Sequence, residues 1–235
     1  MKILAVDTSS SVAAVAVMDN EKLLGEYSIN HKKTHSQKLM PMIKELMSSL
    51  ELLPENIDIY AASSGPGSFT GLRIGVTAVK AVAYAVQKPV ISVPTLDAIA
   101  YNIPVCESLV CPIMDARNSQ VYTALYRRGD GGHERISDYV GVHISELIEM
   151  VRDKHRKVIF AGDAVEIHGE HLKSELKDFC EMAPANLLLQ KASSVAYVAL
   201  LKARRGEMES CFEMVPYYLR KSQAERELEK RCQVD

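Results

Sequence analysis

The residues near the N-terminus with the most obvious chemistry are Asp7, Thr8, Ser9 and Ser10, which follow the apolar run Lys2–Val6. That run predicts a buried strand, so the four polar residues form the turn at its end. Hydroxyls and free backbone N–H groups suit an anion, and the Asp7 carboxylate can anchor a hydrated magnesium ion. The alternative is a turn whose side chains cap their own backbone. The turn contains no lysine, which argues against nucleotide binding.

A second candidate for anion binding is the glycine-rich loop in the run SSGPGSFTG, with candidate residues Gly65, Gly67, Ser68, Thr70 and Gly71. The loop follows a predicted strand and opens a predicted helix, where N–H groups and the helix dipole favour anions. It lacks, however, the Gly-Lys-Ser/Thr ending of a P-loop and the glycine spacing of a dinucleotide-binding loop. We therefore interpret it as a structural turn and helix cap.

Two histidine pairs have spacings that also occur in metal sites. His31 and His35 form a His-x-x-x-His pair, but two lysines lie between them and no glutamate follows the first histidine. His168 and His171 are close in sequence and have no obvious third ligand. A zinc peptidase needs a full ligand set and a glutamate base, and a serine hydrolase needs a GxSxG elbow, which the sequence lacks. We predict no metal at either pair.

The composition is that of an ordinary globular protein of 235 residues, with 47% hydrophobic and 25% charged residues. No run of roughly 18 apolar residues occurs, and the N-terminus does not resemble a signal peptide. The five cysteines share no CxxC spacing, which argues against a disulfide framework or zinc site, so we expect a cytoplasmic protein. A formal net charge of −2 argues against broad electrostatic binding to nucleic acid.

The predicted elements that position these residues occur in the same order twice. The first half has predicted strands at Lys2–Val6, Val12–Val17, Leu23–Ile29, Ile57–Ala62 and Pro89–Val93, and helices at Ser36–Leu50, Thr70–Gln87 and from Thr95. The second half has predicted strands at Leu109–Met114, Gln120–Tyr126, Glu134–Val140 and Lys157–Ala161, and helices at Ser145–Lys154, Glu166–Leu176 and Ala192–Arg205. In each half an aspartate, Asp7 or Asp115, ends the first strand. The repeat predicts an α/β fold of the actin/Hsp70-like (ASKHA) class, a duplicated ribonuclease-H-like unit with subdomains at 1–103 and 104–220 and a charged tail at 221–235.

The predicted helix after the glycine-rich loop is apolar around most of its circumference, so it must be covered on more than one side. One seam consists mostly of small residues, namely Gly71, Gly75, Ala78, Val82 and Ala85. Each glycine in a helix interior costs roughly 1 kcal/mol relative to alanine, so we expect another backbone to approach Gly71 and Gly75 closely. The helix is either sandwiched within its own domain, or packs one seam on a sheet and the other on a partner protein.

Five short motifs along the chain carry a family resemblance. In chain order they are DTSSSVAAVAV, HSQKLMP, SSGPGSFTGLRIG, MDARNSQVY and PYYLRK. Together they resemble the TsaB (YeaZ) family from residue 3 to about residue 222, a group formerly placed with glycoproteases of the peptidase M22 type. The resemblance implies a non-catalytic relative of the TsaD proteins. Such relatives pair with TsaD and the ATPase TsaE, and the assembly transfers a threonylcarbamoyl group to adenosine 37 of tRNA.

The resemblance also predicts which functions have been lost. Catalytic TsaD paralogues hold their metal through a His-x-x-x-His pair, and the matching positions here are Thr95 and Ile99, with Asp97 between them. Isoleucine has no donor atom and threonine cannot replace an imidazole, so we expect no catalytic residues, no metal and no cofactor. We likewise interpret Asp7 to Ser10 as a vestigial phosphate-binding turn with weak or no nucleotide binding.

The resemblance further implies that the helices at Ser36–Leu50 and Thr70–Gln87 meet the matching pair of a TsaD-type subunit. The predicted contact residues are Leu39, Met40, Ile43, Met47, Leu72, Arg73, Gly75, Val76, Ala78, Val79 and Val82. We expect a TsaE-type ATPase in the complex, a homodimer through the same helices when TsaD is absent, tRNA contact only through the complex and no membrane. We also expect Gly75→Leu to leave the monomer folded and to abolish pairing.

Two alternative functions stay open. A free-standing actin-like ATPase or small-molecule kinase would use Asp7, Asp115 and Asp163, and would bind Mg-ATP tightly without a partner. A metallopeptidase acting alone would hold stoichiometric metal when purified.

Overall fold

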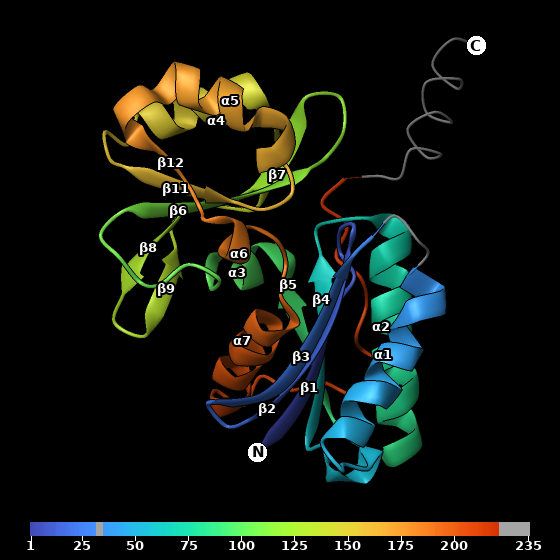
Figure 1. Ribbon diagram of the computed structural model, residues 1–235. Coiled ribbons are helices and arrows are strands. Elements are labelled where there is room, and N and C mark those ends of the chain that lie inside the picture. The colour runs from blue at the N-terminus through green and yellow to red at the C-terminus, as the bar shows by residue number, and fades with distance from the viewer. Residues whose placement is uncertain (32–34, 221–235) are drawn as a thin grey trace, which may run out of the picture.

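The computed structural model describes residues 1–31 and 35–220 and consists of two α/β halves (Figure 1). The first half is built on a five-stranded sheet in the order β3-β2-β1-β4-β5. Its strands are β1 (Lys2–Asp7), β2 (Val12–Asp19), β3 (Lys22–Asn30), β4 (Ile59–Gly65) and β5 (Val90–Pro94). β2 is antiparallel to β1 and β3, whereas β4 is parallel to β1 and β5.

The second half repeats this strand order as β10-β7-β6-β11-β12. Its strands are β6 (Leu109–Asp115), β7 (Gln120–Thr123), β10 (Val140–His143), β11 (Val158–Ala161) and β12 (Cys180–Met182). A side hairpin of β8 (Tyr126–Gly129) and β9 (Gly132–Arg135) joins the sheet through β6. The repeated order, with the same pattern of parallel and antiparallel neighbours, confirms the predicted duplication.

Helices cover both faces of the first sheet. α1 (His35–Ser49) and α2 (Phe69–Val86) pack on one face, and α3 (Thr95–Ala100) and α7 (Ala192–Arg204) pack on the other (Figure 1). Because both faces are covered, β1 and β2 are apolar along nearly their whole length instead of alternating. In the second half, α4 (Ile144–Arg152) and α5 (Val165–Leu176) cover one face, and α6 (Ala185–Leu188) precedes α7. Two 3-10 turns lie at Pro54–Asn56 and Lys177–Phe179.

The predicted strands of the second half differ from the observed ones around Leu125. The predicted strand Gln120–Tyr126 is divided into β7 and β8, because Leu125 bonds away from the main sheet. Its carbonyl accepts from the N–H of Ile136 at 2.8 Å, and its own N–H donates to the Ser137 hydroxyl at 2.9 Å. The predicted strand Glu134–Val140 is likewise interrupted. β9 ends at Arg135 and β10 begins at Val140, and Ile136 and Ser137, which bond to Leu125, lie between them.

The last described helix, α7, returns to the first half, although it follows the second half in sequence. It contacts β1, β2 and β5. Glu26 of β3 caps its first turn, because the Glu26 carboxylate accepts bonds from the N–H and hydroxyl of Ser193 at 2.8 and 2.9 Å. The proposed boundary between residues 103 and 104 lies between α3 and β6, and the proposed 104–220 unit shares its last part with the first sheet. The proposed tail at 221–235 lies outside the described residues.

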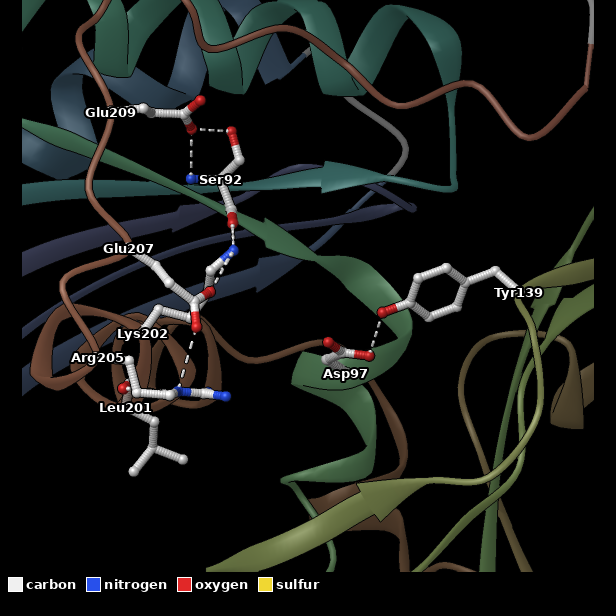
Figure 2. A network of polar contacts seen from close by, with 8 residues as sticks. All are labelled: Ser92, Asp97, Tyr139, Leu201, Lys202, Arg205, Glu207 and Glu209. Carbon is white, nitrogen blue, oxygen red and sulfur yellow. Dashed lines mark hydrogen bonds and ion pairs between the residues drawn. The ribbon is translucent and has the colours of Figure 1, made fainter.

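Residues 206–220 form an extended segment, here named the C-terminal strap, that lies along the first half. Glu209 makes an antiparallel bridge with Val90, and its carboxylate accepts from the N–H of Ser92 at 2.9 Å (Figure 2). Lys202 of α7 donates to the Ser92 carbonyl at 2.9 Å. The strap therefore covers the edge strand β5 and is tied to α7 through Ser92.

α2 packs on the turn after β1 through its small-residue seam. A Cβ atom on Gly71 would lie 2.0 Å from the Thr8 carbonyl oxygen, and one on Gly75 would lie 2.4 Å from Thr8 Oγ1. The Thr8 hydroxyl donates to the Gly71 carbonyl at 2.7 Å. The close approach predicted for these glycines therefore comes from this chain itself, which favours a helix packed inside its own domain.

The ends of α2 are defined by two local interactions. Ser68 caps its N-terminus by accepting a bond from the N–H of Gly71 at 3.3 Å, and Gln87 ends it in the left-handed conformation. Among the described residues, α2 is the one helix with the length and composition to cross a membrane. A core helix meets the same criterion, and α2 lies against β4 and β1.

We expect Gly75→Ala to lower the free energy of unfolding by about 1–3 kcal/mol, because the added methyl group overlaps the Thr8 hydroxyl. The sign is opposite to the gain of roughly 1 kcal/mol that alanine gives over glycine in an open helix. Gly75→Leu places a larger group at the same point, so we expect it to destabilise the monomer as well, which differs from the expectation from sequence. Urea unfolding followed by circular dichroism measures both effects.

The control for this prediction is the same substitution in a Thr8→Ala background. There the nearest remaining atoms are Val6 Cγ1 at 3.6 Å and the Cβ of residue 8 at 3.7 Å, which are ordinary contacts. Gly75→Ala should then cost much less than in the natural sequence. An equal loss in both backgrounds would contradict the packing explanation.

Candidate functional site

Asp7 lies fully buried at the carboxyl end of β1 and holds the turn that follows it. One carboxylate oxygen accepts bonds from the N–H and hydroxyl of Ser9 at 2.8 and 2.7 Å, and the other accepts from the hydroxyl of Ser63 on β4. Burial raises the pKa of Asp7, while these bonds act in the opposite direction. Asp7 therefore joins the ends of β1 and β4 through hydrogen bonds made within the chain.

The glycine-rich loop lies directly on this turn. The N–H of Ser68 donates to the Ser9 carbonyl at 2.7 Å, and a Cβ atom on Gly67 would lie 2.4 Å from the same oxygen. Ser10 is held from the other side, because its hydroxyl donates to Gln190 Oε1 at 2.9 Å. The structure thus brings the two candidate anion sites together, and the hydroxyls of residues 8 to 10 all bond to groups of this chain. The loop therefore lies against the Ser9 carbonyl and covers this side of the turn.

The corresponding turn of the second half is more open. Asp115 ends β6, and its N–H donates to Asp163 Oδ1 at 3.1 Å. Burial, together with the nearby Asp115 carboxylate, raises the pKa of Asp163 to about 6. Arg117, the first of three consecutive residues in the left-handed region with φ of 66°, 53° and 55°, is exposed. The two aspartates are adjacent, and residues 117–119 of the turn beside them are exposed.

The histidine pairs do not come together as metal sites. His35 Nε2 lies 2.7 Å from the Ser10 carbonyl and supports the first turn, and residues 32–34, between His31 and His35, lie outside the described residues. His168 is buried, which lowers its pKa, whereas His171 is exposed. Within residues 1–31 and 35–220, no three His, Cys, Asp or Glu side chains are placed to hold a metal ion.

Most of the predicted partner contacts lie inside this chain's own core. The buried ones are Leu39, Ile43, Met47, Leu72, Gly75, Val76 and Val79. Met40 and Arg73 are exposed, and Ala78 and Val82 are half-buried. This corrects the prediction, because the apolar spacing of the two helices marks the faces that pack on the first sheet. A docking partner can reach only their opposite faces.

The exposed side of α2 borders a groove of about 460 Å³ that it forms with the C-terminal strap. The ring of Tyr84 on α2 packs edge to face against the ring of Phe212 in the strap, with centroids 5.6 Å apart. Phe212 and Val215 are 75% and 63% exposed, although both are large and apolar. Tyr218, which also lines the groove, stacks on Phe69 with ring centroids 4.3 Å apart. Sequence reasoning missed this surface, since the strap has no periodic pattern, and the one signal is the cluster of apolar and aromatic residues from 211 to 218.

The pKa of Asp163 predicts a pH dependence of stability. Because its folded-state pKa of about 6 is above the ordinary 3.8, its contribution is fully present below pH 3.8 and is lost as the pH rises through 6. Asp163→Asn keeps an acceptor for the Asp115 N–H and removes the charge. We expect the substitution to change the free energy of unfolding more favourably at pH 7.5 than at pH 4, with a difference of at most about 3 kcal/mol.

Urea unfolding at the two pH values tests this expectation, with Asp178→Asn as a control at an exposed aspartate. The control measures the same change at an exposed position. An Asp163→Asn effect that does not depend on pH would contradict the assigned burial of Asp163.

Comparison with known proteins places this geometry in a family. The family model described as TsaD, tRNA N6-adenosine threonylcarbamoyltransferase, matches residues 22–228. A protein of Bacillus subtilis (strain 168) named tRNA threonylcarbamoyladenosine biosynthesis protein TsaB is 32% identical over 225 residues, which are 96% of each chain.

Solved structures agree with this assignment. An uncharacterised Pseudomonas aeruginosa protein, described as similar to peptidase YeaZ, has a TM-score of 0.80 and 26% identity, covering 93% of this chain and 99% of that one. Component A of (R)-2-hydroxyglutaryl-CoA dehydratase from Acidaminococcus fermentans shares the fold at a TM-score of 0.51 and 12% identity, covering 87% of this chain and 99% of that one. The fold is thus the duplicated actin/Hsp70-like one, and the chain belongs to the TsaB (YeaZ) family, within the broader family that the TsaD model describes.

Proposed function

We propose that this chain is a non-catalytic subunit of the machinery that makes threonylcarbamoyladenosine at position 37 of tRNA. In this role it binds and activates a TsaD-type catalytic subunit, together with a TsaE-type ATPase. The observation that carries the proposal is the similarity to a protein named TsaB, which extends over 96% of both chains. Involvement in this tRNA modification follows from that name, and the partner role is the finer part of the proposal.

The geometry of the first turn supports the non-catalytic part. In an actin-like ATPase or kinase, the strand-end turn would have to hold a phosphate. Here the hydroxyls of Thr8, Ser9 and Ser10 donate hydrogen bonds to other groups of the chain. Gly67 brings the loop so close that even a Cβ atom would overlap Ser9. This arrangement disfavours the free-standing ATPase, and the described residues offer no ligand set for a metallopeptidase.

The proposed docking face is the outward side of α2 with the adjoining strap. Thr77, Ala81 and Tyr84 of α2 are exposed, and Phe212 and Val215 extend this surface. α2 contains no acidic residue, so a partner helix with apolar residues and a flanking carboxylate suits the face. A TsaD-type partner is suitable because its family model also matches this chain, so it should present a similar helix pair. The same face serves for a homodimer when that partner is absent, and tRNA contacts only the complex.

Ala81→Arg should weaken binding to a purified TsaD-type subunit at least tenfold, because it places a long charged side chain in the middle of the proposed face. A tenfold loss corresponds to about 1.4 kcal/mol of binding free energy. The residue is exposed, so the monomer should keep its circular dichroism spectrum and melting temperature. Isothermal titration calorimetry measures the affinity.

The matched control is Ala185→Arg, the same change at an exposed alanine of α6 in the second half. It should leave the affinity unchanged. Equal affinities for Ala81→Arg and the natural protein would place the interface elsewhere, without removing the proposed role in modification.

The role itself is tested by reconstitution. Transfer RNA is incubated with a threonylcarbamoyl donor, ATP and the TsaD-type and TsaE-type proteins, with and without this chain, and the modified nucleoside is quantified by mass spectrometry. We expect modification only when this chain is present, and none from this chain alone. Full modification without it, or transfer by the isolated chain, would refute the proposal.

A further inference from the structure

The two halves of the molecule meet through a continuous apolar core around α3. From the first half, Leu96, Ile99 and Ile103 enter this core. From the second half, it contains Val110, Met114, Tyr122 and Tyr126 among others. Leu96 and Ile99 are fully buried, so the halves are packed together at this point.

Asp97 of α3 is the polar centre of this junction. Its Oδ1 atom accepts a hydrogen bond from the hydroxyl of Tyr126 on β8 and another from the hydroxyl of Tyr139, each at 2.6 Å. Figure 2 shows Tyr139 of the second half reaching Asp97 in the first turn of α3. Hydrogen bonds to a carboxylate are roughly twice as strong as those between neutral groups, and here two of them cross between the halves.

The tyrosines are themselves held in place. Tyr126 is 2% exposed, and burial raises the pKa of both hydroxyls, so they remain donors at neutral pH. The Arg135 guanidinium lies 4.1 Å from the centroid of the Tyr139 ring. The Tyr217 ring of the strap is 6.2 Å from the Tyr139 ring. Asp97 thus accepts from side chains whose positions are fixed by their own neighbours.

The C-terminal strap crosses the same junction. On the first half, the N–H of Tyr217 donates to the Ser64 carbonyl at 2.7 Å. Three residues later, the Arg220 guanidinium donates to the Ala116 carbonyl of the second half at 3.2 Å. Leu219, between them, packs against the shared core. The strap therefore bridges the two halves beside the turn after β6.

We propose that Asp97, with Tyr126 and Tyr139, locks the two halves into one rigid body that does not open and close around a ligand. Asp97 is the positioning residue of this lock, and the strap reinforces it. Asp97 lies between Thr95 and Ile99 on one turn of α3. By the family resemblance, these two positions match the metal-binding histidines of catalytic paralogues. This inference concerns the motion of the chain and is independent of its proposed role in tRNA modification.

Hydrogen exchange of the full chain, followed by mass spectrometry, tests the lock. In Asp97→Ala we expect amide exchange in residues 95–101 and 136–140 to accelerate at least tenfold, while β1 exchanges as before. In Tyr126→Phe and Tyr139→Phe, each of which removes one hydroxyl, we expect smaller accelerations of at least threefold in the same segments. Adding ATP with magnesium to the natural protein should leave exchange in these segments unchanged.

The matched control is Tyr60→Phe, because Tyr60 is equally buried and its hydroxyl donates to the Pro54 carbonyl at 2.8 Å within the first half. It should not accelerate exchange at the junction. If Asp97→Ala fails to fold, the two phenylalanine variants decide. Unchanged exchange in both of them, or protection of the junction by Mg-ATP in the natural protein, would overturn the proposal.

Discussion

The contact between α2 and the turn after β1 is the constraint on which the rest of the site depends. Gly71 and Gly75 let the helix approach until the Thr8 carbonyl and hydroxyl touch its backbone. The loop before α2 is thereby drawn over Ser9, so the strand-end turn is covered from above. The same approach fixes which side of α2 faces outward, beside the strap. The absence of two Cβ atoms therefore both closes the turn and determines which face of α2 is exposed.

The repeated fold could be predicted because strands and helices have local patterns, and the duplication needs only their order. The Asp7 turn and the glycine-rich loop could also be identified, but not their contact, which depends on how β1, β4 and α2 meet in space. The docking residues were predicted less well. Apolar spacing in α1 and α2 marks one face, and the sequence does not say whether a sheet or a partner covers it. The strap could not be predicted, because an extended segment held by isolated hydrogen bonds shows no repeating pattern of residues in the sequence.

The two halves have the same strand order but have diverged at equivalent points. In the first, the end of β1 is sealed by hydrogen bonds and a loop. In the second, the end of β6 carries Asp115 beside Asp163 on a more exposed turn. Between them, α3 presents Asp97 to tyrosines of the second half. In this chain the strand ends of the first half and the junction are used for internal contacts.

The return of α7 to the first sheet has a consequence for biosynthesis. Ile3, Ala5 and Ile91 lie on the face that α7 covers, together with Val195 and Ala199 of that helix. Their strands leave the ribosome about 100 or more residues before α7 does, at roughly 5–20 residues per second, so one apolar face of the nascent sheet stays uncovered for several seconds. Such surface is prone to aggregate and is bound by chaperones. The N-terminal half is thus first in the sequence but cannot complete its core until nearly the whole chain has been translated.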